Sequence, residues 1–457
     1  MIPALLLIPV LVAMAMLNGN PPERVTQKVY LPCLMLLPLY LEFKLGGFLV
    51  GFTSLVALLL AVVGWQRWSR TVKFTTLDAL VFAYALSAFY SDLHAHAINV
   101  ATYAFLWSFT RWVCPYVIGR TLIEQTGSRT VFSRVIVLCL AAVAVISLYE
   151  YRLGYNPFQH AVEFLIHEQL NIGGQYRWGF ARITGPYGLS IIAGLTFATG
   201  VMFQLWLVGT KSWLQSAPAR FLKGRKAPLY MTLIVLMGLF ITQSRGPWIG
   251  CAFGLIVASI GFSKNRRQAA IYSISTLIVV GTFTTVVLKQ YTTADERKTR
   301  DRDQLNAEYR ANLYETYKPL LDEGGAWGYG TPHLLLNGGI GWSEKQTSID
   351  NEYLRVAMQQ GYVGIAIFIL LLFFSLVQLI RLCITLRSRE DILFAYCMLG
   401  VFVSASFTLS TVFLGEPMIQ LLFLCMGWAQ SVRPSKALED RTAPVNTQQY
   451  QFERVFV

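Results

Sequence analysis

Residues 361–382 read GYVGIAIFILLLFFSLVQLIRL, a run of 22 residues in which Arg381 carries the only charge. A helix needs about 20 predominantly apolar residues to cross the roughly 30 Å hydrocarbon core of a bilayer. An uninterrupted run of this length is typical of a transmembrane helix and exceeds what a core helix of a soluble protein needs. The stretch therefore predicts that the chain is inserted in a membrane.

Comparable apolar runs recur along the chain. Of its 457 residues, 54% are hydrophobic and 14% are charged, whereas soluble domains contain about 25% charged residues. The predicted spans are residues 2–17, 28–43, 46–65, 76–92, 98–118, 131–149, 187–209, 228–244, 247–263, 269–289, 361–382, 392–409 and 416–431. The expected fold class is all-α, a polytopic transmembrane helical bundle of about 12–13 spans. The first two runs are short and the second contains Pro32 and Pro38, so either is also compatible with a re-entrant segment.

Two longer polar segments interrupt the spans. Residues 1–289 would contain about ten spans and a smaller exterior loop at 150–186. Residues 290–360 would form the large exterior loop, with short helices in it, and residues 361–431 the last spans. The polar tail, 432–457, is expected to be cytoplasmic and disordered.

The positions of Lys and Arg predict the orientation. Short loops that are rich in these residues stay in the cytoplasm, and four such loops fall on one side of the bundle: 66–75, 210–227, 264–268 and 383–391. The segments 150–186 and 290–360 then lie on the opposite, periplasmic side of a bacterial inner membrane. This distribution accounts for the net charge of +13 without a nucleic-acid partner.

Three arginines lie on the predicted exterior side, where positive charge runs against this bias. Arg182 precedes the span 187–209, Arg245 follows the span 228–244, and Arg310 lies in a helical-looking part of the large loop. Arginine offers a planar fork of donors that is suited to phosphate. Several converging arginines would bind a lipid diphosphate; the alternative is that each lies among lipid headgroups or pairs with an acid of the loop.

An acidic residue lies near the start of the last long apolar run. Asp350 is placed to act as a general base toward a sugar hydroxyl, with Asn351 orienting it or the substrate. The structural alternative is a helix N-cap formed by Ser348 or Asp350. His333 is a secondary candidate for proton transfer. The seven cysteines lie in or beside apolar runs without a CxxC pair, which predicts neither a disulfide framework nor a metal site.

From Arg182 to about Gly364 the chain resembles the O-antigen ligase and O-antigen polymerase superfamily of bacterial membrane glycosyltransferases. The resemblance rests on a helix that ends in Ser244-Arg245-Gly246, a large exterior loop and a closing motif. In the ligases that motif is His followed by Asn, Ser or Gln, nine residues and Gly-x-x-Gly. Here it reads Asp350-Asn351, nine residues and Gly361-x-x-Gly364, so an aspartate replaces the histidine.

The resemblance implies transfer of a glycan from undecaprenyl diphosphate to an acceptor hydroxyl, with inversion at the anomeric carbon and without metal, cofactor or nucleotide sugar. Arg182, Arg245 and Arg310 would neutralise the departing diphosphate. Asp350, or else His333, would take the acceptor proton. The implied partners are the lipid-linked glycan, membrane lipid, the acceptor and polysaccharide assembly proteins.

Two enzyme activities remain open at this stage. The replacement of the ligase histidine by Asp350 favours a polymerase of O-antigen or exopolysaccharide repeat units, whose acceptor is another undecaprenyl-linked chain; the alternative is a ligase that transfers to lipid A-core or protein. A lipid-linked oligosaccharide flippase is the main hypothesis of another class. A flippase should place charges along a path through the bilayer and have short loops, whereas the candidates here gather under a loop of about 70 residues.

Overall fold

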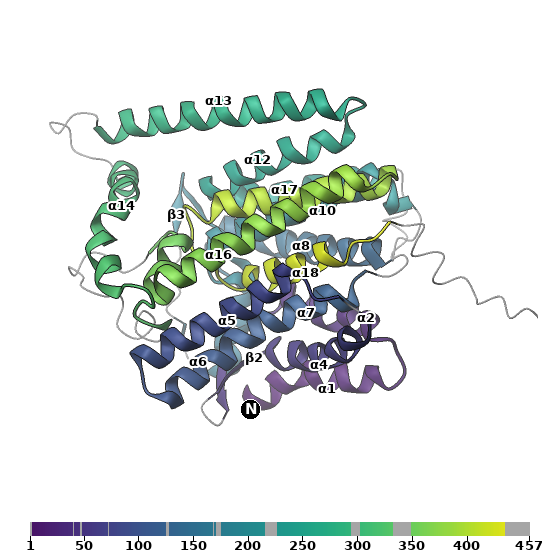
Figure 1. The fold of residues 1–457 in the computed structure, drawn as a ribbon. Coiled ribbons are helices and arrows are strands. Elements are labelled where there is room, and N and C mark those ends of the chain that lie inside the picture. The colour runs from purple at the N-terminus through teal and green to yellow at the C-terminus, as the bar shows by residue number, and fades with distance from the viewer. Residues whose placement is uncertain are drawn as a thin grey trace, which may run out of the picture.

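The computed structural model describes residues 2–39, 41–45, 48–71, 73–124, 128–167, 169–170, 175–214, 226–293, 302–331 and 349–434. Most of these residues form helices that run side by side in one bundle (Figure 1). Five described helices are long and apolar enough to cross a membrane. The prediction of an all-α, multi-pass membrane bundle is confirmed.

The elements follow one another with short connections. The first half of the chain forms α1 (Ile2–Leu17), α2 (Pro22–Val25), the π-helix η1 (Thr26–Tyr30), α3 (Leu31–Leu36), β1 (Glu42–Leu45), β2 (Phe48–Gly51), α4 (Ser54–Thr71), α5 (Thr76–Ala95), α6 (Ile98–Arg111), α7 (Val113–Leu122), α8 (Ser128–Leu153), α9 (Pro157–Ile166), β3 (Tyr176–Arg177), β4 (Phe180–Ala181) and the 3₁₀ turn η2 (Gly185–Tyr187). The second half forms α10 (Ser190–Gly209), η3 (Ser212–Leu214), α11 (Ala227–Ile241), α12 (Arg245–Ser259), η5 (Ile260–Phe262), α13 (Arg266–Thr293), α14 (Arg302–Gly324), α16 (Glu352–Thr385), α17 (Arg389–Thr408) and α18 (Met418–Ser431).

The predicted span 28–43 is wrong as a single helix. Helix α3 ends at Leu36, and Leu37 is extended, with ψ 146°, as the residue before a proline prefers to be. The chain then turns into the antiparallel β1–β2 hairpin. This hairpin places Glu42 beside Arg111, which is 2% exposed and also pairs with Glu416 at 2.6 Å. The buried guanidinium is thereby neutralised inside the bundle.

The predicted span 98–118 is divided into two helices. The break lies at Trp112, whose φ is −110° and ψ −60°. Pro115 follows in the first turn of α7, and because proline has no N–H it cannot donate to the carbonyl oxygen of Arg111. The helix therefore stops at Arg111 and restarts at Val113.

Contacts between distant segments define two ends of the bundle. At one end, here called the loop end, Ile183 N donates to Ile241 O at 3.4 Å and Glu352 N donates to Leu409 O at 2.9 Å. The opposite, basic end is fixed by other contacts. Helix α17 connects the two ends.

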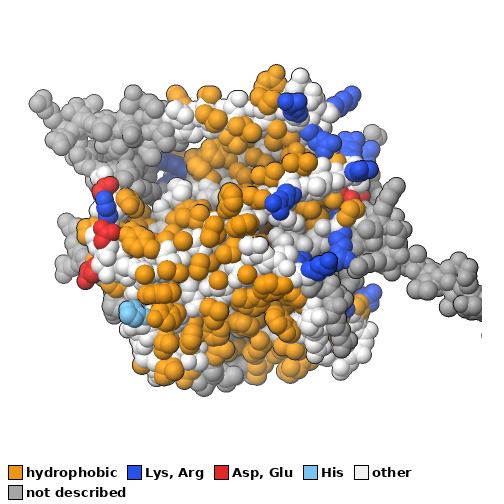
Figure 2. Space-filling view, in the orientation of Figure 1, with side chains coloured by type: hydrophobic (Ala, Val, Ile, Leu, Met, Phe, Trp, Pro, Cys, Tyr) orange, Lys and Arg blue, Asp and Glu red, His pale blue; other side chains and the backbone are white. Residues whose placement is uncertain are grey.

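The basic end is held together by ion pairs and backbone contacts. Arg129 lies 2.5 Å from Asp391 at the start of α17, and Arg120 donates to the carbonyl oxygen of Gln430 at 2.7 Å. Figure 2 shows Lys and Arg side chains gathered at the right of the molecule, in the orientation of Figure 1, and acidic side chains at the left. The charge asymmetry expected from the sequence thus follows the long axis of the helices.

Helices α12 and α17 approach each other through glycine. A Cβ on Gly254 would lie 2.6 Å from the carbonyl oxygen of Gly400, and a Cβ on Gly400 would lie 2.7 Å from the carbonyl oxygen of Gly254. No side chain fits between the two backbones at this point. Small residues are the usual means of close helix packing in membranes, and here they fix α12, which begins at Arg245, against α17.

Candidate functional site

The turn between α11 and α12 lies at the loop end and carries Arg245. Helix α11 ends at Ile241, Ser244 is the N-cap residue of α12, and Arg245 is the first helical residue. Pro247 falls in the first turn of α12, where its missing N–H costs nothing. Gln243 has φ 49° and its side chain is 1% exposed. A strained backbone at a buried glutamine is typical of turns whose shape serves a site.

Arg182 contacts this turn from the preceding exterior loop. Its Nε donates to the carbonyl oxygen of Thr242 at 3.3 Å and its Nη2 to Ser244 Oγ at 2.9 Å. Arg177 was not among the candidates from the sequence, yet its Nη1 donates to the carbonyl oxygen of Gln243 at 2.8 Å. Arg177 and Arg182 flank the β3–β4 hairpin, and both therefore meet the turn that carries Arg245. We call Arg177, Arg182 and Arg245 the arginine cluster.

A buried carboxylate fixes the segment that follows Arg182. The Glu150 side chain at the end of α8 accepts hydrogen bonds from Thr184 N at 2.8 Å, Thr184 Oγ1 at 2.8 Å and Gly185 N at 2.9 Å. Glu150 is 5% exposed. Because hydrogen bonds to a charged acceptor are the stronger kind, this contact anchors the exterior loop to a transmembrane helix. Sequence patterns give no sign of this role.

Asp350 and Asn351 lie at the start of α16. Asn351 is the N-cap residue, and its Oδ1 accepts from Leu354 N at 3.1 Å. The structural alternative in which Ser348 or Asp350 caps the helix is therefore wrong, because the cap lies one residue later than Asp350. Asp350 is half-buried, and its carboxylate is not needed to begin the helix.

One turn of the chain joins Asp350 to the arginine cluster. Glu352 N donates to the carbonyl oxygen of Val412 at 3.1 Å, and Leu414 N donates to the Glu352 carboxylate at 2.7 Å. On the other side of the same turn, a Cβ on Gly246 would lie 2.6 Å from Thr411 Oγ1. Residues 409–414 thus contact both the residue after Arg245 and the first residue of α16.

Helix α16 is broken at Gly361, which has φ 65° and ψ −165°. The residues around the break pair with the loop that follows α14. Tyr329 N donates to Met358 O at 3.0 Å, Gly330 N to Gln359 O at 2.9 Å, Tyr362 N to Gly325 O at 3.1 Å and Val363 N to Ala326 O at 3.1 Å. The break therefore lets part of the large loop pair with α16 through the backbone.

The end of α5 holds the same loop. Asp92 is 0% exposed, and one of its carboxylate oxygens accepts from Thr331 N. A Cβ on Gly330 would lie 3.0 Å from His96 Cδ2. Asp92 is a positioning residue that the sequence analysis missed. The signal for it was available, since Asp92 is an acid at the exterior end of a predicted span.

Two predicted site residues are not tested by this geometry. Arg310 lies in α14, and its side chain is outside the described residues. His333 is outside the described residues altogether. Within the described part of the chain, no three His, Cys, Asp or Glu residues are grouped so as to hold a metal ion.

Comparison with known families gives one match. The O-antigen ligase family model matches residues 230–369. The chain is a member of the O-antigen ligase and polymerase superfamily. No curated protein matches it significantly.

The matched region contains much of the superfamily site expected from the sequence. It begins in α11 and includes Arg245, Asp350, Asn351 and Gly361. Arg182 lies outside it. The glycine of the superfamily motif acquires a physical role, because Gly361 is where α16 breaks and the large loop joins it.

Proposed function

We propose that this superfamily member transfers a glycan from undecaprenyl diphosphate to an acceptor hydroxyl at the periplasmic face of the inner membrane. The superfamily supports ligase-type or polymerase-type activity in general. The observation that carries the finer proposal is the turn 409–414, which contacts both Gly246 and Glu352. It brings the arginine cluster and Asp350 to one region of the loop end.

The proposed reaction is a direct displacement. The acceptor oxygen attacks the anomeric carbon of the lipid-linked glycan, the bond from that carbon to the diphosphate oxygen breaks, and undecaprenyl diphosphate leaves. The acceptor proton passes to the Asp350 carboxylate. Arg182, Arg245 and Arg310 neutralise the charge that develops on the diphosphate, which is usually a large contribution to catalysis. Arg177 joins this set because it contacts the same turn.

We further propose that the acceptor is a second lipid-linked chain, so that the enzyme is a polymerase. Asp350 replaces the ligase histidine, and this departure distinguishes the chain from the ligases. Transfer to lipid A-core or protein would instead make it a ligase. Incubation of the purified enzyme with lipid-linked repeat units alone separates the two, because only a polymerase lengthens the chains without another acceptor.

Replacing Arg245 by lysine should lower the rate of transfer about 10- to 150-fold. Lysine keeps the charge but loses the planar fork, and a hydrogen bond to a charged group contributes about 1.5–3 kcal/mol. The rate is measured on the purified enzyme with lipid-linked substrate. Arg389→Lys is the matched control, since Arg389 is exposed at the basic end. Equal rates for Arg245→Lys and the control would contradict the diphosphate role.

A cysteine at Tyr314 should react with a membrane-impermeant maleimide added to intact spheroplasts, whereas a cysteine at Lys73 should react only after lysis. Tyr314 is 59% exposed in α14, and Lys73 is exposed at the basic end. Both are placed in a variant without the native cysteines. The reverse labelling pattern would place the arginine cluster in the cytoplasm and exclude the periplasmic reaction.

A further inference from the structure

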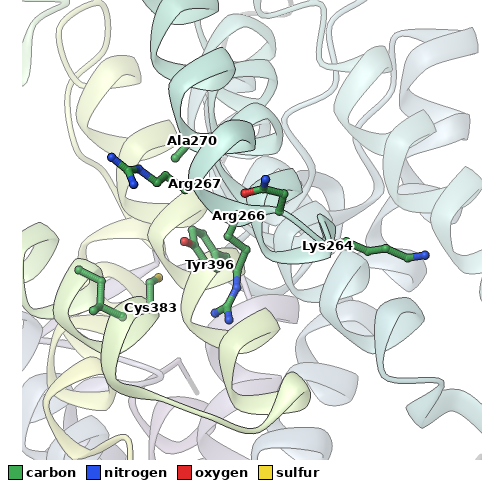
Figure 3. A pocket seen from close by; sticks show the side chains of 8 residues that line it. Lys264, Arg266, Arg267, Ala270, Cys383 and Tyr396 are labelled. Carbon is green, nitrogen blue, oxygen red and sulfur yellow. The ribbon is translucent and has the colours of Figure 1, made fainter.

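A second candidate binding site lies at the basic end of the bundle. A cavity of about 690 Å³ opens between the start of α13, the end of α16 and the first half of α17. Its lining includes Lys264, Arg266 and Arg267 from the first segment, Cys383 and Ile384 from the second, and Tyr396 from the third. Figure 3 shows Arg266 extending beside Tyr396, while Lys264 points away from it.

The charge of this cavity favours an anion. Three cationic side chains line it, and none of its lining residues is Asp or Glu. The acids at the start of α17 serve other contacts, since Asp391 pairs with Arg129 at 2.5 Å and the carbonyl oxygen of Glu390 accepts from Trp206 at 3.2 Å. Two guanidinium groups and a phenol are donors suited to phosphate oxygens.

The surface next to the cavity is apolar. Ile384 is 76% exposed, and on α13 Ile271 is 55% and Ile274 57% exposed. Ile271 lies four residues after Arg267, about one helical turn or 6 Å farther along the axis. A phospholipid has the same sequence of groups, a phosphate followed at once by acyl chains. The exposed isoleucines are thus positioned to contact the chains of a lipid whose phosphate lies in the cavity.

This cavity is separate from the arginine cluster. The helical segment Arg245–Phe262 has 18 residues, which corresponds to about 27 Å at 1.5 Å per residue. That length approaches the thickness of the hydrocarbon core. A diphosphate bound at Arg245 therefore cannot also occupy the cavity, which faces the other leaflet.

We infer that the cavity binds an anionic glycerophospholipid of the inner leaflet, with its phosphate held by Arg266 and Arg267 and its acyl chains against α13 and α16. Basic pockets between membrane helices commonly bind such headgroups. The bound lipid bridges α13 to α16 and α17. In Figure 1, α13 lies at the edge of the bundle, so this bridge stabilises the helix that leads into the large loop.

The test measures binding of dioctanoyl-phosphatidylglycerol to the full-length protein in a neutral detergent. We expect saturable binding, no comparable binding of dioctanoyl-phosphatidylcholine, and an affinity about thirtyfold lower for the double variant R266Q/R267Q. This loss corresponds to about 2 kcal/mol, or about 1 kcal/mol for each cation. Lys73→Gln, an exposed cation of the same end outside the cavity, should retain the wild-type affinity.

Two more measurements distinguish lipid binding from misfolding of the variant and from binding of free phosphate. R266K/R267K keeps the charge and should bind within a fewfold of the wild type, which controls for misfolding of the glutamine variant. Inorganic phosphate at millimolar concentration should not displace the lipid. Equal binding of the two lipids, wild-type affinity of R266Q/R267Q, or full displacement by phosphate would each overturn the proposal.

Discussion

Replacing Asp350 by asparagine should lower the rate of glycan transfer by a factor of about 10²–10⁴, the usual scale for removing a general base. Asparagine has nearly the same shape but cannot accept the proton of a hydroxyl. The N-cap of α16 is Asn351, so the substitution leaves the start of the helix intact. The readout is the glycan chain-length distribution in a strain without the wild-type gene, together with the rate of the purified enzyme.

The matched control is Asp322→Asn. Asp322 lies in α14 and accepts from the Tyr362 hydroxyl at 2.6 Å, and an asparagine oxygen can still accept that bond, so we expect a rate within twofold of the wild type. Asp350→His should recover part of the activity, because imidazole is a competent base near neutral pH. Long glycan chains from Asp350→Asn would contradict the proposal and make His333 the first candidate for the base.

The second large effect is expected from Gly361→Ala, which should abolish transfer while the transmembrane helices remain folded. A Cβ at this position would lie 2.3 Å from the carbonyl carbon and oxygen of Ala326 and 2.4 Å from Trp327 N. These are backbone atoms, so no side-chain rotation relieves the contact. The four hydrogen bonds between the loop and α16 should open, each contributing about 0.5–1.5 kcal/mol.

Hydrogen exchange measures this opening directly, since the amides of Tyr329 and Gly330 should lose protection in Gly361→Ala. Gly325→Ala separates the clash from backbone strain. Gly325 also has a positive φ, 58°, but a Cβ there would meet nothing within 4 Å. It should cost only about 1–2 kcal/mol. Equal exchange in the two variants would show that the close approach at Gly361 is unimportant.

The sequence predicted the elements that depend on local composition. The run 361–382 begins at the residue where α16 breaks, because the apolar run and the motif glycine coincide at Gly361. The run 28–43 was misjudged because its composition is apolar throughout. Its shape follows instead from Pro38 and from the pairing of Glu42 with the distant Arg111, which no window of sequence contains.

The candidate site was predictable to a similar degree. Arg182 and Arg245 stood out because cations are unexpected on the exterior side, and the structure brings Arg182 to the turn that carries Arg245. Arg177 and Glu150 did not stand out, since their importance lies in bonds to backbone groups of other segments. Only the folded chain reveals which carbonyl oxygen or amide a side chain meets.

The glycine contact between α12 and α17 has a mechanical consequence. Both helices are locked at Gly254 and Gly400, so neither slides along the other, and their loop-end termini keep a constant height relative to each other. Arg245 begins one of them, and the turn after the other contacts Glu352. The pair therefore acts as a fixed ruler between the diphosphate and the base. The large loop is then free to change length or sequence, and with it the choice of acceptor sugar, without resetting the distance over which the bond is exchanged.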